Sequence, residues 1–242
     1  MVSFVEKVFQ LLIPSQCPCC KRFLREGEQR LCSDCLMEIR WIEPPFCSVC
    51  GTPFLSGEVD SHPCGACLLK KRYFKTARAL GSYEGPLQEA IHQWKYEGKD
   101  SLGVLFGEWM SEGFHRYWGS TFFDLLIPVP LHKKRLRERG FNQALLLVKE
   151  LGRQTGIPYR KRVLRKRSLA VPQVKLSGAE REKGVRGTFE LTGKEEVAGK
   201  SILLVDDVYT TGATVNECSR VLRAAGAERV DVFTLAHAIK RS

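Results

Sequence analysis

Eight of the ten cysteines in this 242-residue chain fall into four Cys-x-x-Cys pairs, all before residue 68. The pairs are Cys17/Cys20, Cys32/Cys35, Cys47/Cys50 and Cys64/Cys67. Each pair can present two thiolates to one ion, and two pairs complete the tetrahedral coordination that Zn²⁺ adopts in structural sites. Disulfides of a secreted protein are the alternative, but Glu6 and Lys7 interrupt the apolar stretch that a signal peptide needs. The pairs therefore predict two Cys₄ zinc sites in a cytoplasmic protein.

The grouping of the four pairs stays open at this stage. Sequential grouping leaves gaps of 11 and 13 residues, which suit a zinc ribbon, and a crossed grouping satisfies the same coordination. Cys19 lies inside the first pair, and His62 stands two residues before Cys64 without being needed as a ligand. Cys218 falls on the apolar face of a predicted helix, where we expect a small buried side chain.

A second chemical feature is the sequence ILLVDDVYTTGAT, which begins at Ile202 and ends at Thr214. Its continuous apolar run is typical of a buried parallel strand. Asp206 and Asp207 follow at the carboxyl end, which is where open parallel sheets bind their ligands. Thr214 and Glu217 fit a T-x-x-E capping box, so we expect the next helix to begin at Thr214.

The residues between the acidic pair and this helix are small or hydroxylated. At a helix N-terminus, such residues let backbone N–H groups converge on an anion, and Thr210, Thr211 and Thr214 can add hydroxyl donors. Two carboxylates would repel a phosphate that they touched, but they can accept hydrogen bonds from the hydroxyls of an attached sugar. The segment therefore predicts a sugar-phosphate site. The alternative, an acidic pair that merely ends a strand in a solvated turn, explains less of this pattern.

Positive charge is concentrated in one part of the chain. The net charge is +11, and residues 130–186 hold 17 Lys and Arg against 4 Asp and Glu, whereas the remainder holds 21 against 23. A basic segment of this kind attracts phosphates, either on a small molecule or on a nucleic acid. Only Phe141 and Tyr159 are aromatic within it, which argues against a platform on which bases stack.

The pattern of the chain changes near residue 76. Residues 1–75 form a Cys-rich module with few apolar runs, and residues 76–242 alternate strands with helices, as in a doubly wound α/β domain with a mainly parallel sheet. We expect a strand and turn over 77–85, further strands over 123–130, 201–207 and 229–238, and helices over 86–98, 102–117, 142–156 and 214–226.

The N-terminus has an apolar periodicity that fits one helix face. The residues on this face are Phe4, Val5, Val8, Leu11 and Leu12. Such a helix can pack on its own protein or lie on a membrane surface. No apolar run is long enough to span a bilayer, so we expect no stable membrane insertion.

These segments together resemble a known family. ILLVDDVYTTGAT is similar to the phosphoribosyl pyrophosphate (PRPP) motif of type I phosphoribosyltransferases. The Cys pairs, YEGPLQEAIHQWKYEG, IPVPLHKKRLRERGFNQA and PQVKLSGAEREKGVRGTFEL extend the resemblance, over nearly the whole chain, to the ComF family. These are competence-associated, phosphoribosyltransferase-like proteins linked to DNA uptake. The resemblance implies a type I phosphoribosyltransferase-like fold after a double zinc ribbon.

The resemblance also implies roles for individual residues. Asp206 and Asp207 would hold the ribose hydroxyls of PRPP, which binds together with Mg²⁺, and the following loop would hold its 5-phosphate. The PRPP-binding segment is then Asp206, Asp207, Val208, Tyr209, Thr210, Thr211, Gly212, Ala213 and Thr214. The turn 131–135 would occupy the pyrophosphate-loop position and bring Lys133, Lys134 and Arg135 to the diphosphate as catalytic candidates.

Residues 165–189 match the flexible loop that closes over the substrate in type I enzymes. Arg167, Gln173 and Arg181 are its polar candidates, and Gly184 departs from the family pattern, which commonly has asparagine there. Asn142 ends the family's RGFN run, and it can equally be a helix N-cap. Lys95 and Tyr96 match a family Lys-Tyr pair, although the tyrosine can also simply end an amphipathic helix.

Two classes of function fit these features. The first is a phosphoribosyltransferase that moves phosphoribose from PRPP to an unidentified nitrogen acceptor and releases pyrophosphate. The second is a non-catalytic protein of DNA uptake. It would sense PRPP, bind single-stranded DNA through the basic segment, or dock a competence-machinery protein through the zinc ribbons.

Overall fold

A computed structural model describes residues 15–28, 30–54, 59–98, 100–167 and 185–239. Its centre is a four-stranded parallel sheet with the strand order β1-β6-β5-β2. These strands are β1 (Ala77–Ser82), β2 (Leu125–Pro128), β5 (Ser201–Tyr209) and β6 (Arg229–His237). A separate antiparallel hairpin joins β3 (Leu164–Lys166) to β4 (Phe189–Leu191). The parallel sheet confirms the predicted α/β class.

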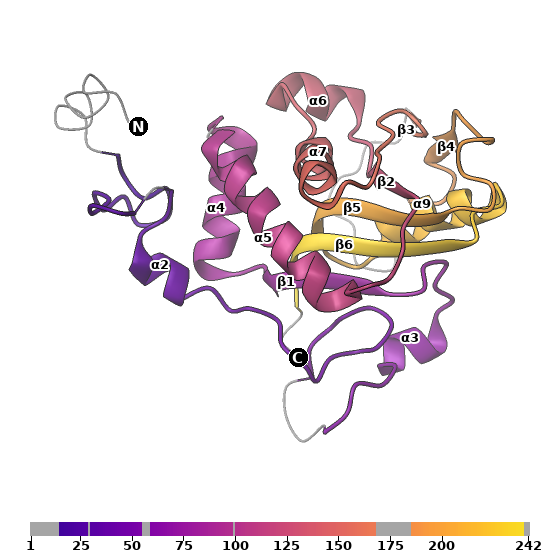
Figure 1. Ribbon diagram of the computed structural model, residues 1–242, viewed down its shortest axis with the longest axis horizontal. Helices are drawn as coiled ribbons and strands as arrows, with labels where there is room; N and C mark the ends of the chain where they lie inside the picture. The colour runs from indigo at the N-terminus through magenta and orange to yellow at the C-terminus, as the bar shows by residue number, and fades with distance from the viewer. Residues whose placement is uncertain (1–14, 29, 55–58, 99, 168–184, 240–242) are drawn as a thin grey trace.

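Helices cover both faces of the sheet (Figure 1), because the central strands are apolar on both sides. Leu203 and Val205 of β5 face one hydrophobic core, and Ile202 and Leu204 face the other. The first core is shared with α4 (Gly85–Tyr96), α5 (Asp100–Trp118) and α7 (Gln143–Thr155). The second is shared with α9 (Ala213–Ala224). The short helix α6 (Lys133–Arg139) follows β2.

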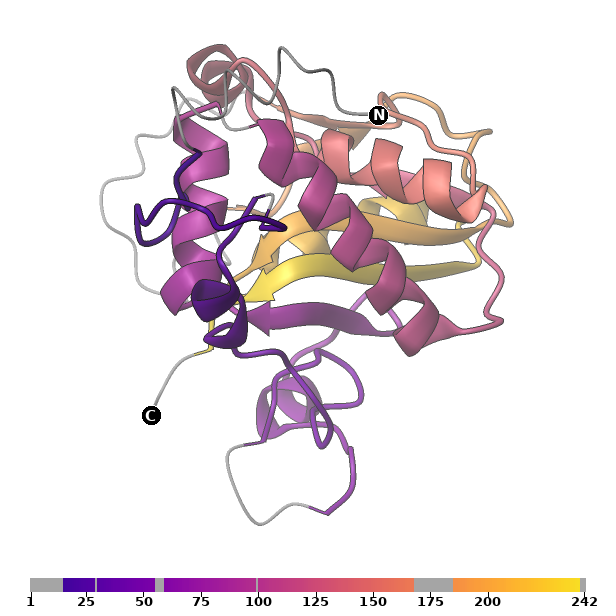
Figure 2. The same cartoon turned by 60° about the vertical axis from the view of Figure 1, so that its left-hand side comes forward.

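The Cys-rich part packs beside β1, the edge strand of the sheet (Figure 2). We call residues 16–37 the first zinc ribbon and residues 46–69 the second; they end with α2 (Ser33–Met37) and α3 (Gly65–Leu69), respectively. The linker between them pairs with β1 through the Ile42 amide, which donates to the Leu80 carbonyl at 2.8 Å. From the second ribbon, the Val49 carbonyl accepts from the Ala77 amide at 2.7 Å. These contacts cover backbone groups that an edge strand would otherwise expose.

Most predicted elements are present, with shifted ends. The apolar face of α4 is buried as the periodicity indicates, and Cys218 is buried on α9. The strand expected to stop at the acidic pair runs on to Tyr209, and the next helix begins at Ala213. Among the described residues, no helix is long and apolar enough to cross a membrane. The predicted N-terminal helix, with Phe4, lies outside the described residues.

Candidate functional site

The eight paired cysteines gather into two clusters. Cys17, Cys20, Cys32 and Cys35 form one, and Cys47, Cys50, Cys64 and Cys67 form the other; within each, the sulfur atoms lie within 4.8 Å of one another. This arrangement selects the sequential grouping over the crossed one. Cys19 and His62 are outside both clusters.

Each cluster is built by tight turns that aim backbone N–H groups at sulfur. In the second ribbon, the Sγ of Cys47 accepts from the amides of Cys50 at 3.3 Å and Cys64 at 3.2 Å. A hydrogen bond from the Cys50 thiol, helped by these amides and opposed by burial, lowers the pKa of Cys47 to about 4. In the first ribbon, backbone amides outweigh burial and lower the pKa of Cys17 to about 6. Because zinc binds thiolates, these donor sets fit two structural Zn²⁺ ions.

The acidic pair lies near the carboxyl end of β5, between two cationic side chains. The Nζ of Lys95, on α4, contacts the Oδ2 of Asp207 at 2.9 Å, and both side chains are largely buried. Lys166, on β3, lies close enough to Asp206 for their charges to interact. The structure therefore brings together groups from three elements that are distant in the sequence.

Burial and the neighbouring carboxylate of Asp207 raise the pKa of Asp206 to about 7. The Asp207 amide donates to Asp206 at 2.9 Å, and this bond and the charges of Lys95 and Lys166 limit the rise. Burial lowers the pKa of Lys166, and the charge of Arg135 adds to this effect. The pair can therefore accept hydrogen bonds from sugar hydroxyls, most fully once Asp206 is ionised.

The loop after β5 is shorter than the sequence suggests, since only residues 210–212 separate strand from helix. Gly212 has a positive φ of 75°, and a Cβ there would lie 2.2 Å from the Tyr209 hydroxyl. Only glycine fits this position. The Thr211 hydroxyl accepts from the Ala213 amide at 3.3 Å, and Thr210 is exposed. The first turn of α9 leaves backbone N–H groups without intrahelical acceptors, as an anion site requires.

The predicted capping box is wrong. Gly212, rather than Thr214, is the N-cap residue of α9, and no side chain caps the helix. The carboxylate of Glu217 instead accepts from the Gly187 amide at 2.7 Å and pairs with Arg220. Because Glu217 is one turn inside the helix, its side chain can reach the end of the segment that precedes β4. The spacing of Thr214 and Glu217 therefore matches a capping box, but the contacts of Glu217 with Gly187 and Arg220 replace the capping hydrogen bond.

Lys133, Lys134 and Arg135 are exposed, and they form the first turn of α6 rather than a loop. The Nδ1 of His132 accepts from the Lys134 amide at 3.2 Å and caps this helix. The turn lies at residues 129–132, between β2 and α6, rather than at 131–135. It is close to the carboxyl end of β5, because Pro128 pairs with Val205. The helix therefore starts at the same edge of the sheet as the acidic pair.

The RGFN segment, residues 139–142, makes contacts that hold elements together at this edge of the sheet. Arg139 donates to the Tyr96 hydroxyl at 2.7 Å and lies over its ring, which ties α6 to α4. Phe141 contacts the ring of Trp94. Asn142 occupies the N-cap position of α7 without a capping bond, and its amide donates to the Val129 carbonyl at 3.1 Å instead. These contacts position the turn after β2.

Arg167 is paired with Glu190 across the β3–β4 hairpin at 2.7 Å, and its side chain is mostly exposed. Gln173, Arg181 and Gly184 lie outside the described residues. Sequence reasoning missed Lys166, and the dense basic run around it gives no signal that singles it out. Lys95 was noted only through the Lys-Tyr pair.

The fold and these clusters define a class of protein, a phosphoribosyltransferase-like domain preceded by a double zinc ribbon. Two family models match accordingly, the double zinc ribbon domain over residues 8–68 and the phosphoribosyl transferase domain over residues 143–241. Among solved structures, glutamine PRPP amidotransferase from B. subtilis superposes on 55% of this chain and 26% of its own, at 24% identity and a TM-score of 0.38.

Full-length relatives narrow the class to one family. Competence protein F of Haemophilus influenzae is 30% identical, and the match spans 92% of this chain and 97% of that protein. DNA utilization protein YhgH of Escherichia coli K12 is 31% identical over 93% and 98%. Competence protein ComFC of Bacillus subtilis is 29% identical over 88% and 86%. The chain belongs to the ComF family.

Proposed function

We propose that this protein binds PRPP with Mg²⁺ and transfers its phosphoribosyl group to a nitrogen acceptor, with release of pyrophosphate. The observation that carries the proposal is the acidic pair near the carboxyl end of β5. Residues 210–212 connect this strand to the N-terminus of α9. Asp206 and Asp207 would accept hydrogen bonds from the ribose hydroxyls, and residues 210–214 would hold the 5-phosphate.

The proposed reaction breaks the bond between ribose C1 and the diphosphate oxygen, and the electron pair leaves with pyrophosphate. A nitrogen lone pair of the acceptor forms the new C1–N bond, and that nitrogen loses a proton. Lys133, Lys134 and Arg135 can stabilise the charge of the departing diphosphate from the first turn of α6. Lys166 adds a half-buried cation near Asp206. Mg²⁺, an ion that prefers oxygen ligands, would neutralise diphosphate charge when bound.

The test is calorimetric titration of PRPP with Mg²⁺ into the zinc-loaded full chain. We expect Asp206→Asn with Asp207→Asn to abolish binding while circular dichroism stays unchanged. Glu112→Gln with Glu195→Gln is the matched control, because both carboxylates are exposed and neither lies on an element assigned to the site. Unchanged PRPP affinity in the Asp206/Asp207 double variant would contradict the assignment of this pair to the ribose hydroxyls. Release of pyrophosphate in an acceptor screen then separates a transferase from a PRPP sensor.

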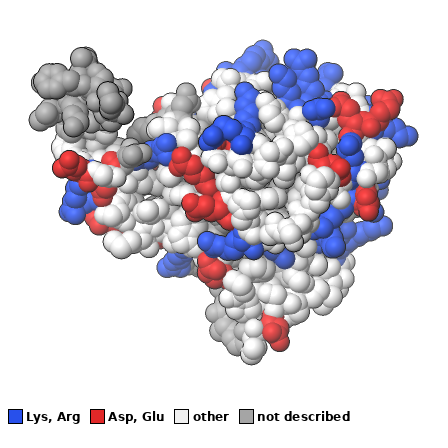
Figure 3. Space-filling model, in the orientation of Figure 1, with Lys and Arg blue, Asp and Glu red and all other residues white. Residues whose placement is uncertain are grey.

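A second function, binding of single-stranded DNA, is favoured by the distribution of charge. Figure 3 shows Lys and Arg side chains gathered over α6, which contributes five of them. Two relatives are named for competence and one for DNA utilization. If α6 contacts phosphodiesters, the affinity for a single-stranded oligonucleotide falls steeply with salt, and Lys133→Gln with Arg137→Gln reduces that slope by about two. A slope that these substitutions leave unchanged would count against this surface.

We also propose that residues 1–75 and 76–242 act as two modules of a cytoplasmic protein. The thiolate ligands of both ribbons need a reducing environment, which supports this location. The ribbons would hold the module together in place of a core, and their surfaces could dock a competence-machinery protein. Pull-down of purified competence proteins with residues 1–75 deleted from the chain tests the docking role.

A further inference from the structure

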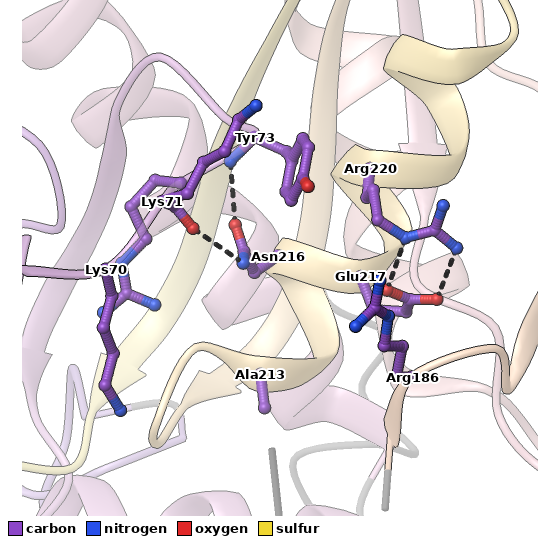
Figure 4. A pocket seen from close by; sticks show the side chains of 9 residues that line it. Lys70, Lys71, Tyr73, Arg186, Ala213, Asn216, Glu217 and Arg220 are labelled. Carbon is purple, nitrogen blue, oxygen red and sulfur yellow. Dashed lines mark hydrogen bonds and ion pairs between the residues drawn. The ribbon is translucent and has the colours of Figure 1, made fainter. Parts of the chain in front are cut away.

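A cleft of about 350 Å³ lies between the segment that leaves the second zinc ribbon and the first two turns of α9 (Figure 4). At Ala213 the cleft borders residues 210–214, the proposed phosphate loop, but neither residue of the acidic pair lines it. The charged residues that line it come from three parts of the chain and are Lys70, Lys71, Arg72, Arg186, Glu217 and Arg220. Five of these six are cationic.

The one acid does not balance this charge, because its carboxylate is already engaged. Glu217 accepts from Arg220 at 2.7 and 2.8 Å and from the Gly187 amide at 2.7 Å (Figure 4). The pair of Glu217 and Arg220 is neutral, and Arg72 interacts with the thiol of Cys67. Lys71 and Arg186 therefore leave the cleft with a net positive charge. Like charges that converge on a concave surface repel one another, and a bound anion relieves this repulsion.

The walls of the cleft are held at a fixed separation by one side chain. Asn216 Oδ1 accepts from the Tyr73 amide at 2.8 Å, and Asn216 Nδ2 donates to the Lys71 carbonyl at 3.3 Å. Figure 4 shows this amide linking the two walls. The Nζ of Lys71 lies 5.2 Å from the centre of the Tyr73 ring. The backbone that carries Lys71 is thus fixed against α9 before any ligand arrives, which lowers the entropic cost of binding.

A neighbouring hollow shares Lys71, Arg72 and Tyr73, but its other arginines have structural partners. Arg223 donates to the carbonyls of Ala227 and Glu228 at the end of α9, and Arg229 pairs with the buried Asp231. These arginines therefore hold the turn before β6 together. The cleft at Arg186 is the better anion site.

We propose that this cleft binds the oligophosphate group of a second ligand, at a site separate from the acidic pair. Lys71 and Arg186 would contact the phosphates from opposite walls, an ammonium on one side and a planar guanidinium on the other. A di- or triphosphate carries more negative charge than a single phosphate and can reach cations on both walls. The site does not depend on PRPP binding, although its occupant would lie beside the phosphate loop.

The test is calorimetric titration of inorganic tripolyphosphate into the zinc-loaded full chain and three double variants. We expect Lys71→Gln with Arg186→Gln to weaken binding at least tenfold. Lys149→Gln with Lys194→Gln, a matched loss of two exposed cations outside the cleft, should bind as the parent does. The Asp206→Asn, Asp207→Asn variant should also bind as the parent does, even if it no longer binds PRPP.

Wild-type affinity in the Lys71/Arg186 variant would overturn the proposal, and so would loss of tripolyphosphate binding in the Asp206/Asp207 variant, because the anion would then occupy the acidic-pair site. ATP in place of tripolyphosphate distinguishes a nucleotide from a free oligophosphate; equal weakening of both by the Lys71/Arg186 substitutions assigns the site to the phosphates. If a single-stranded oligonucleotide depends on these residues and neither oligophosphate does, the cleft is a nucleic-acid surface and the proposal fails.

Discussion

The two zinc ribbons have the same ligand set but contact different parts of the molecule. The first packs on the helical layer, where the Cys19 thiol donates to the Pro86 carbonyl at 3.2 Å and Arg30 pairs with Glu108 at 2.8 Å. The second packs under the sheet edge and beside the end of β5. Cys47 and Cys50 share a hydrophobic core with Tyr209, the last residue of β5. Because the two ribbons have the same ligands, the effect of losing zinc from one of them depends on the elements that this ribbon contacts.

Close backbone approach allows the second ribbon this position. Gly51 follows Cys50 with a positive φ of 70°, and a Cβ there would lie 2.6 Å from the Ala77 carbonyl oxygen. Tyr209 in turn contacts His237, with ring centroids 4.5 Å apart. A continuous set of contacts therefore joins the second zinc cluster to Tyr209, which precedes the loop after β5.

The largest expected difference between the ribbons follows loss of one ligand in each. Cys67→Ser and Cys20→Ser should each remove about one zinc ion per chain, as measured by metal analysis, because a Cys₄ site loses a quarter of its ligands. Only Cys67→Ser should increase amide hydrogen exchange over residues 209–217 and weaken PRPP binding, by about tenfold or more. Equal increases in exchange over 209–217 in both variants would refute the comparison.

Asn216→Ala separates the second ribbon from α9 without touching the metal. It removes two hydrogen bonds, and we expect a loss of about 1–2 kcal/mol in the free energy of unfolding by urea. Asn142→Ala is the matched control, because it removes one hydrogen bond on the opposite helical layer, and it should cost about half as much. An Asn216→Ala protein as stable as the parent would mean that this link contributes nothing.

The acidic pair should respond to pH in the same way whichever ribbon is intact. Because the pKa of Asp206 is raised to about 7, its ionised fraction grows about tenfold between pH 6 and pH 8, and PRPP affinity should rise by a similar factor. The stability of the ligand-free protein should change in the opposite sense. The folded state holds this proton more tightly than the unfolded state, so that contribution is lost as the pH rises toward 7.

Calorimetry at both pH values and thermal unfolding without ligand check these two signs. The Cys20→Ser variant serves as the control, because its acidic pair is untouched and its affinity should follow the same profile. A PRPP affinity that does not change between pH 6 and pH 8 would contradict the role assigned to Asp206.

The smallest change in stability is expected on substitution of Tyr209, which lies between the second ribbon and the proposed phosphate loop. Its buried hydroxyl has no hydrogen-bond partner among the described residues. Tyr209→Phe removes an unsatisfied polar group without opening a cavity at the ring, so the free energy of unfolding should stay within about 1 kcal/mol of the parent or rise slightly. A loss above this range in urea unfolding would show that the hydroxyl makes a contact in solution.

Local sequence patterns predicted the elements well where burial and periodicity agree. The apolar run before Asp206 is a strand because four consecutive apolar side chains can be buried only between two helical layers. The face of α4 was predicted in the same way. The capping box failed because its acid finds a better partner, the Gly187 amide and Arg220, than the N-cap backbone. Lys133–Arg135 were assigned to a loop because nothing local marked His132 as a helix cap.

The sequence by itself determined which groups are available: eight thiolates spaced for two zinc ions, and two carboxylates beside a hydroxyl-rich turn. These are properties of neighbours along the chain, and spacing alone defines them. Only the tertiary structure decided which cations face Asp206 and Asp207, because Lys95 and Lys166 come from elements that the sheet brings to one edge. It also decided that one ribbon lies on the helices and the other beside the end of β5. That choice depends on packing between distant segments, and no local pattern encodes it.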